Sequence, residues 1–382
     1  MREINVGMLT ELVTRHAQDE IRENKVSVKE IIVHQNGNRV YHGLFGATEA
    51  QARERIIFRA ASMTKPITSA AVSILADRGL LDLDRPAYDY YPQMKHLHVA
   101  EIKDNKIISL RPVKNTIRVR DLLSHTSGIG CAPLFTTLEH SGLNLTLQQA
   151  VETILTHPLS FEPLTDQAYS ATDAFDIAAG IAEIVSGVPF DEFLEENLFK
   201  PLGMTDTTFS PTPEQWKRFI PMHNRTKDGR SETVSMPEGD VFETASPKRC
   251  LAGGGLCVTA EDYIRFADML CLGGITPVGV RILSPESILR MRTSNLPECV
   301  KMGSESWALG MRVITSSDYP HGLGVGCFGW SGAYGTHFWV DPENSLSVVM
   351  MKNSLYDGGA GNRSACELER DVTESLKCSS DL

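Results

Sequence analysis

Apolar residues near the N-terminus first recur at helical spacing and then at the spacing of strands. Leu9 and Val13 share one face of an amphipathic helix, which we expect to pack on another element. β-branched runs on both sides of Asn36-Gly37 predict a hairpin, because this dipeptide favours a tight turn. The chain is therefore predicted to begin with a helix over 5–22, strands over 28–35 and 38–43, and a third strand over 55–59 that leads to Ser62.

The middle of the chain has helical periodicity, and β character begins after Ser306. A helix begins at Ser62, and further helices are predicted near 117–124, 146–156, 172–186, 190–198, 260–272 and 364–376. The later strands are predicted over 307–314, 327–330, 335–340 and 345–352. Strands therefore lie at both ends of the chain, with helices between them.

This order favours an α/β (α+β) fold with one antiparallel sheet assembled from both ends of the chain and flanked by helices. We predict that residues 1–65 and 251–382 together form the sheet domain. Residues 66–250 would form a mostly helical inserted domain, with the active site in the cleft between the two.

The composition excludes several classes of function. The chain has 382 residues and a net charge of −11 without a Lys/Arg-rich run, so nucleic-acid binding is not expected. No apolar run is long enough to span a bilayer, and the first residues lack the apolar centre of a signal peptide. These two observations predict a cytoplasmic protein that does not bind membranes. The eight cysteines form no C-x-x-C pair and the histidines show no ligand spacing, so we predict reduced thiols and no metal site.

Ser62 and Lys65 stand three residues apart at the start of an apolar helix, and this spacing places them on one helical face. A serine hydroxyl becomes a strong nucleophile when a nearby base takes its proton. A buried lysine can do so, because burial lowers its pKa. The alternative is an exposed serine beside a solvated lysine, so the interpretation depends on partners elsewhere in the chain.

Tyr169 follows a turn-rich segment and precedes a predicted helix, where its phenol could point into a cleft. A neighbouring cationic lysine lowers the pKa of a tyrosine, because the positive charge favours the phenolate. Tyr169 is therefore a candidate base for Ser62. The alternative is a ring that only packs.

A strand near residue 330 is rich in small residues, which usually mark a close backbone approach or a bulge. Its central residues are Trp330, Ser331, Gly332 and Ala333. A substrate carbonyl lying along this strand could accept hydrogen bonds from a main-chain N–H there and from that of Ser62, which would form an oxyanion hole. The alternative is a strand whose glycines only loosen its packing and whose tryptophan belongs to the core.

Two further motifs are weaker. The G-x-G-x-x-G pattern over 324–329 precedes a strand instead of joining a strand to a helix, so no dinucleotide or other cofactor is expected. His125 lies close to Ser127, but the chain contains no G-x-S-x-G motif. We interpret the segment around His125 as a structural turn whose histidine bonds to buried backbone groups.

Three segments resemble, in order, the motifs of the serine β-lactamase and penicillin-binding-protein superfamily: Ser62-Met63-Thr64-Lys65, Tyr169-Ser170-Ala171 and Trp330-Ser331-Gly332. Over roughly residues 25 to 355 the chain looks most like the class C β-lactamase-like esterases, also called family VIII carboxylesterases. The resemblance implies the same fold, with a sheet domain and an inserted helical domain.

The same resemblance implies roles for individual residues. Ser62 would be the acylated nucleophile, with Lys65 and Tyr169 as the base pair. The oxyanion donors would be the N–H groups of Ser62 and Ala333.

Two departures from the family's pattern bear on the substrate. Ala171 replaces an asparagine that would bind a substrate amide. Trp330 replaces a lysine or histidine that would bind a carboxylate. The loss of both polar groups favours neutral, apolar acyl groups.

The leading hypothesis is a serine carboxylesterase that hydrolyses small or short-chain esters through a Ser62 acyl-enzyme. The alternatives are an acyltransferase, an amidase, a weak β-lactamase or a D-peptidase on the same fold, or a catalytically silent ligand-binding sensor. The expected partner is a small-molecule ester, and a homo-oligomer is left open.

Overall fold

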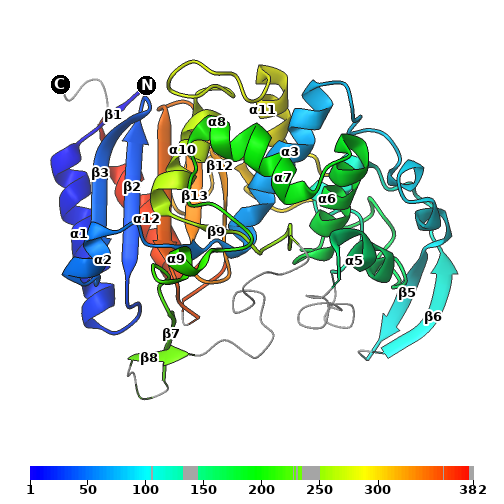
Figure 1. The fold of residues 1–382 in the computed structure, drawn as a ribbon, viewed down its shortest axis with the longest axis horizontal. Helices are drawn as coiled ribbons and strands as arrows, with labels where there is room; N and C mark the ends of the chain where they lie inside the picture. The colour runs from blue at the N-terminus through cyan, green and yellow to red at the C-terminus, as the bar shows by residue number, and fades with distance from the viewer. Residues whose placement is uncertain are drawn as a thin grey trace.

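The computed structural model describes residues 1–104, 106–131, 145–226, 228, 231–234, 250–355 and 357–377, and Figure 1 shows their arrangement. The described helices are α1 (Val6–Arg22), α2 (Glu49–Arg53), α3 (Thr64–Asp77), α4 (Val119–Leu123), α5 (Leu147–Ile154), α6 (Asp173–Ser186), α7 (Phe190–Leu194), α8 (Lys200–Leu202), α9 (Pro213–Trp216), α10 (Ala260–Cys271), α11 (Pro285–Met291) and α12 (Arg363–Glu374). Four shorter helical turns are η1 (Ala61–Met63), η2 (Ala87–Asp89), η3 (Pro92–His96) and the π-helical η4 (Glu195–Phe199). The described strands are β1 (Glu3–Ile4), β2 (Lys29–Gln35), β3 (Asn38–Phe45), β4 (Phe58–Arg59), β5 (His98–Lys103), β6 (Lys106–Pro112), β7 (Met222–Arg225), β8 (Ser231–Val234), β9 (Cys257–Val258), β10 (Glu305–Trp307), β11 (Arg312–Ile314), β12 (Phe328–Ser331), β13 (His337–Asp341), β14 (Leu346–Lys352) and β15 (Leu376–Lys377).

An antiparallel seven-stranded sheet, in the order β10-β11-β12-β13-β14-β2-β3, lies at the centre of the fold. Strands from the two ends of the chain meet where β14 pairs with β2, from Leu346 opposite Gln35 to Lys352 opposite Lys29. The short strands β1 and β15 also pair, which ties the N-terminal segment to the C-terminal one.

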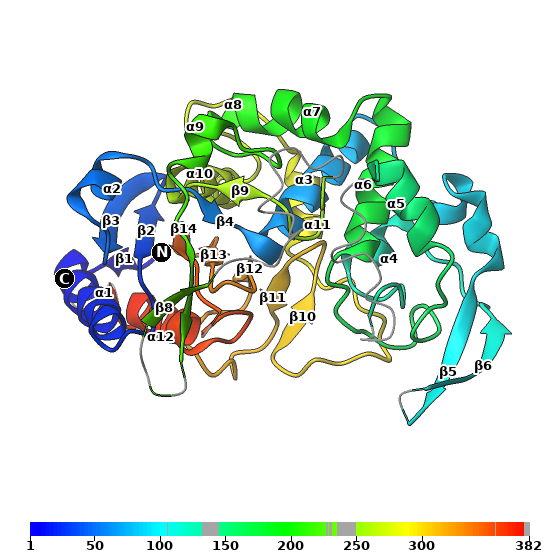
Figure 2. The same cartoon turned by 60° about the horizontal axis from the view of Figure 1, so that its bottom comes forward.

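Helices cover both faces of this sheet, as Figures 1 and 2 show. Successive side chains of a strand point to opposite faces. In β14, Val348 and Met350 pack in a core with residues of α1 and α12, whereas Val349 and Met351 pack in the larger core with residues of α10. Because both faces are buried, a slip of one residue in register would exchange the two sets of side chains, and the alternation therefore fixes the register.

The predicted α/β class and the antiparallel sheet built from both ends of the chain are confirmed. The N-terminal helix and the first hairpin also lie where the pattern predicted them, as α1 and as β2 with β3. The division into two domains remains a prediction.

Two strand predictions were wrong in detail. Residues 307–314 form two strands, β10 and β11, because the chain reverses at Gly310, where φ is 70° and the N–H donates to the Leu123 carbonyl at 2.7 Å. Of residues 55–59 only β4 is a strand, and it pairs with β9 outside the large sheet. The N–H of Ile57 bonds instead to the Arg218 carbonyl at 3.1 Å, which holds this segment away from the large sheet.

Two hairpins occur within the segment predicted to be mostly helical. The β5–β6 hairpin extends from one end of the molecule in Figure 2, and β7 pairs with β8. Across the described ranges, no helix combines the length and the apolar character required to cross a membrane.

Candidate active site

Ser62 lies in the turn η1, immediately before α3. The preceding residue, Ala61, has φ of 48°, a left-handed conformation that costs a non-glycine residue about 1 kcal/mol or more. Two hydrogen bonds hold this reversal: the Thr64 hydroxyl donates to the Ala61 carbonyl at 2.7 Å, and the Tyr263 hydroxyl donates to the Met63 carbonyl at 2.7 Å. The result is a partly exposed serine on a rigid, buried support.

Lys65 lies one helical turn further along and is fully buried. Its Nζ is 3.3 Å from the Ser62 Oγ and donates to two main-chain carbonyls, those of Ala171 at 2.6 Å and Gly253 at 2.7 Å. The two carbonyls can approach each other because Gly253 has no side chain. A Cβ there would lie 2.6 Å from the Thr172 Cα and 2.7 Å from the Ala171 oxygen.

Burial lowers the pKa of the Lys65 amine from its ordinary value, and the nearby Tyr169 and Asp176 act in the opposite direction. A neutral amine has two N–H groups and one lone pair. In the protonated form all three N–H groups have acceptors: the carbonyls of Ala171 and Gly253 and the Ser62 Oγ. In the neutral form the two carbonyls hold both N–H groups, which leaves the lone pair for the Ser62 hydroxyl. The arrangement can therefore accept the serine proton.

Tyr169 lies above Lys65, with its ring centroid 4.7 Å from the lysine Nζ. Its hydroxyl accepts a hydrogen bond from the Trp330 Nε1 at 3.2 Å. Its ring also contacts His125 at a centroid distance of 4.6 Å and Trp307 at 5.9 Å. These contacts hold the phenol in an aromatic cluster beside Lys65.

The ring of His125 packs against the ring of Tyr169. Its contacts confirm the structural role that the sequence predicted for this histidine. The fully buried ring accepts a hydrogen bond at Nδ1 from the Ser170 N–H at 3.1 Å. Burial, assisted by the charge of Lys65, lowers the pKa of His125 well below its usual value. The histidine therefore stays neutral and fixes the backbone next to Tyr169.

The third motif packs directly on the Ser62 turn. A Cβ at Gly332 would lie 2.4 Å from the Ala60 oxygen and 3.2 Å from the Ala61 Cβ, so only glycine fits this contact. The Thr336 hydroxyl donates to the same Ala60 carbonyl at 3.0 Å. Ala333 follows Gly332 and is exposed.

Ser331 belongs to the predicted strand, but its side chain is engaged elsewhere. Its buried hydroxyl lies 2.8 Å from the Nδ1 of His337, the residue opposite it on β13. His337 in turn lies 3.1 Å from a carboxylate oxygen of Glu369 in α12. Ser331 thus contributes its backbone to the site and its hydroxyl to a buried polar chain.

The structure therefore brings together Ser62, Lys65, Tyr169 and Trp330 as the sequence predicted. Sequence reasoning missed the two carbonyl acceptors of Lys65 and the ring contacts of His125 and Trp307. A run of three glycines after Ala252 was the available signal for the close contact at Gly253. Within the part of the chain that the structure describes, no group of three or more His, Cys, Asp or Glu side chains is placed to hold a metal ion.

Comparison with known proteins gives a consistent result. The family model described as Beta-lactamase matches residues 15–366. The chain is 32% identical to protein Rv1367c of Mycobacterium tuberculosis over 77% of each chain, and 28% identical to esterase EstB of Burkholderia gladioli over 89% of each chain. Among solved structures, EstCE1, a hydrolase with promiscuous acyltransferase activity, superposes with a TM-score of 0.78 at 21% identity, covering 96% of this chain and 99% of the other.

The burial of Lys65 predicts a specific dependence of stability on pH. Between the lowered pKa of Lys65 in the folded state and its ordinary value of 10.5, the unfolded chain holds a proton that the folded chain has lost. Stability contributed at this site must therefore rise with pH in that window, by at most about 1.4 kcal/mol per pH unit. The free energy of unfolding of the wild type, minus that of Lys65→Met, should increase from neutral pH toward 10.5 in urea titrations.

The control for this measurement is Lys217→Met, because the Lys217 side chain is 68% exposed. Its difference from the wild type should change less across the same pH series than the Lys65→Met difference does. A flat or falling difference for Lys65→Met would show that the folded protein does not lower the pKa of Lys65.

Proposed function

Because the chain belongs to the β-lactamase family, whose members are serine hydrolases and transferases, we propose that it is a carboxylesterase that acts on small neutral esters through an acyl-enzyme at Ser62. The observation that carries the proposal is the Lys65 Nζ, buried, bonded to two carbonyls and 3.3 Å from the Ser62 Oγ. A lysine that served only packing would have no need of a serine hydroxyl at that position. The 28% identity to a named esterase supports the same class of substrate.

In the acylation step, Ser62 Oγ attacks the ester carbonyl carbon while its proton passes to the neutral Lys65 amine. We assign the oxyanion to the main-chain N–H groups of Ser62 and Ala333. The close approach of Gly332 to Ala60 supports this assignment, because it brings the two segments that carry these groups together. The Tyr169 oxygen already accepts the Trp330 N–H, so its own proton is available for the leaving alkoxide. Acylation thus ends with a lysine ammonium beside a tyrosine phenolate.

Deacylation reverses these transfers. The Tyr169 phenolate takes a proton from water, and the resulting hydroxide attacks the acyl carbon. Ser62 Oγ leaves and recovers its proton from the Lys65 ammonium. The two groups return to their starting states, so no external acid or base is required.

We attribute the preference for neutral acyl groups to the aromatic side chains of Trp330 and Trp307 and to the absence of a side-chain amide at Ala171. Trp330 lies where related enzymes carry a cation, and its ring packs edge-on against Trp307 at a centroid distance of 4.4 Å. Ala171 offers Lys65 a backbone carbonyl and has no side-chain amide for a substrate. Neither residue can bind a carboxylate, and both favour apolar groups.

We also propose that the site lies between a sheet domain, 1–65 with 251–382, and an inserted domain, 66–250.

Removing the nucleophile tests the mechanism. Ser62→Ala should lower kcat for p-nitrophenyl acetate by about 10⁴-fold or more, because it removes the oxygen that would attack the ester carbonyl. Labelling of the protein by a fluorophosphonate probe should also disappear. Ser73→Ala, a change at a fully buried serine of the same helix, is the matched control and should keep both properties.

Two other outcomes of this experiment favour the alternatives. A wild-type protein that takes up no fluorophosphonate would indicate a catalytically silent sensor. Transfer of the acyl group to an added alcohol in preference to water would indicate an acyltransferase.

Changing Trp330 tests the substrate class. Trp330→Lys should change the preference between two esters, one with a carboxylate on its acyl group and one neutral. The ratio of their kcat/KM values, charged over neutral, should rise by about tenfold to a hundredfold, because a charge-assisted hydrogen bond contributes about 1.5–3 kcal/mol. Trp330→Phe removes the hydrogen bond to Tyr169 without adding charge, so it should slow both substrates and leave the ratio unchanged. An unchanged ratio in Trp330→Lys would rule out this residue as the determinant of charge preference.

A further inference from the structure

Two buried lysines face each other at one end of the central sheet. Lys352, the last residue of β14, lies opposite Lys29 of β2, and their exposed fractions are 0% and 3%. Like charges directly opposite each other on neighbouring strands are destabilising, and burial adds to that cost. Each lysine therefore requires a partner of opposite charge.

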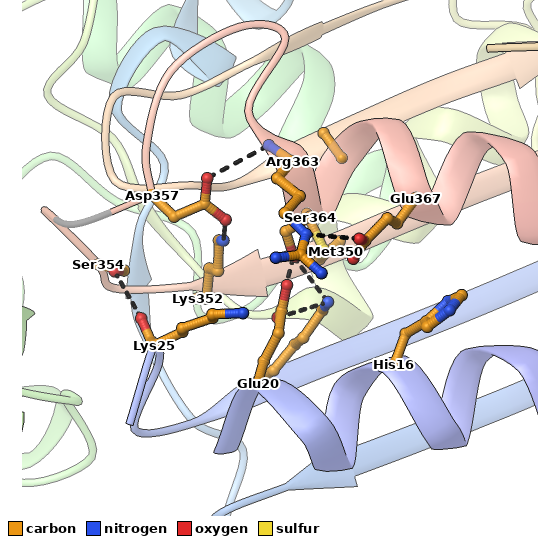
Figure 3. A network of polar contacts seen from close by, with 12 residues as sticks. His16, Glu20, Lys25, Met350, Lys352, Ser354, Asp357, Arg363, Ser364 and Glu367 are labelled. Carbon is orange, nitrogen blue, oxygen red and sulfur yellow. Dashed lines mark hydrogen bonds and ion pairs between the residues drawn. The ribbon is translucent and has the colours of Figure 1, made fainter. Parts of the chain in front are cut away.

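Both lysines interact with the charge of Glu20, but their hydrogen-bond partners differ. Figure 3 shows Lys352 with Asp357, and Glu20 with Ser364, from close by. The Lys29 Nζ bonds to Glu20 of α1 at 2.9 Å and to the Ser364 hydroxyl of α12 at 2.7 Å. The Lys352 Nζ bonds to Asp357 at 2.9 Å, in the loop between β14 and α12. Lys29 thus joins the two helices behind the sheet, whereas Lys352 holds a loop.

That loop and the stem of Lys352 pack against the turn that follows the third motif. A Cβ at Gly335 would lie 2.1 Å from the Lys352 Cε and 2.9 Å from the Asp357 carbonyl oxygen. A Cβ at Gly358 would lie 1.8 Å from the Ala333 carbonyl oxygen. The backbones are therefore in direct contact, with no side chain between them.

Hydrogen bonds connect the same two segments. The Gly359 N–H donates to the Gly332 carbonyl at 3.0 Å, and the Ser354 N–H donates to the Tyr334 carbonyl at 2.9 Å. The second carboxylate oxygen of Asp357 accepts from the Arg363 N–H, at the start of α12, at 3.3 Å. The turn at 332–335 is thus held on one side by the Ser62 turn and on the other by the loop that Lys352 closes.

We propose that Lys352 and Asp357 are positioning residues for the oxyanion hole: their ion pair holds the described parts of the loop, 353–355 and 357–361, against the turn at 332–335 and so fixes the N–H of Ala333. This inference rests on the proposed function, because it assigns an oxyanion donor to Ala333. Neither residue touches the substrate. Lys29, in the same buried network, contacts Glu20 and Ser364 and does not hold the turn.

The test compares two lysine variants that are matched in residue type, burial and network. Lys352→Met should lower kcat for p-nitrophenyl acetate by about tenfold or more while KM changes less than about twofold, because an oxyanion donor acts mainly in the transition state. Lys29→Met should lower the unfolding temperature to a similar degree but change kcat by less than about twofold. Amide hydrogen exchange at 333–335 should be faster in Lys352→Met and unchanged in Lys29→Met.

Asp357→Asn keeps the experiment informative if Lys352→Met does not fold, because the Asp357 side chain is partly exposed. It should lower kcat in the same direction by a smaller factor. The double variant Lys352→Met/Asp357→Asn should be no slower than Lys352→Met alone, since the two residues act as a unit.

The outcomes separate this inference from the proposed function. If the wild type hydrolyses the ester and is labelled at Ser62, but Lys352→Met keeps its kcat or falls only as far as Lys29→Met, the positioning role is wrong and the esterase assignment stands. If the wild type neither turns over the ester nor takes up the probe, the proposed function fails and the positioning role fails with it.

Discussion

The burial of one amine, that of Lys65, is the constraint on which the site depends. A fully buried lysine needs acceptors for its N–H groups, and here they are the carbonyls of Ala171 and Gly253. The amine therefore joins three segments that are far apart in the chain: α3, the segment after Tyr169 and the loop before β9. The same contacts that satisfy the lysine also place it beside Ser62, so stability and chemistry depend on one set of hydrogen bonds.

The aromatic side chains near Lys65 carry the proposed preference for neutral substrates. A cation at position 330 would compete with Lys65 for anionic groups, whereas the indole of Trp330 offers only its N–H, and that N–H is bonded to Tyr169. The rings of Tyr169, Trp330, Trp307 and His125 pack together as one aromatic cluster. In the proposed function, this cluster accounts for the preference for neutral acyl groups.

The third motif is held in position from two sides. Gly332 rests on the backbone of Ala60, and Gly358 rests on the carbonyl of Ala333. β12 and β14 are strands of the same seven-stranded sheet, so the sheet sets the spacing between the turn that follows β12 and the loop that follows β14.

The sequence by itself determined the features that depend on local geometry. The three-residue spacing of Ser62 and Lys65 follows the helix period, and the Asn36-Gly37 turn follows the backbone preference of that dipeptide. Neighbouring residues set both. The split of 307–314 into two strands, the pairing of β4 with β9 and the direction of the Ser331 hydroxyl were decided by the tertiary structure. Each depends on a partner distant in the chain or across the sheet, such as Leu123, Cys257 or His337, which no local pattern reveals. The same holds for the two carbonyls at Lys65, since every residue type has a carbonyl and only the packed chain decides which ones a buried amine meets.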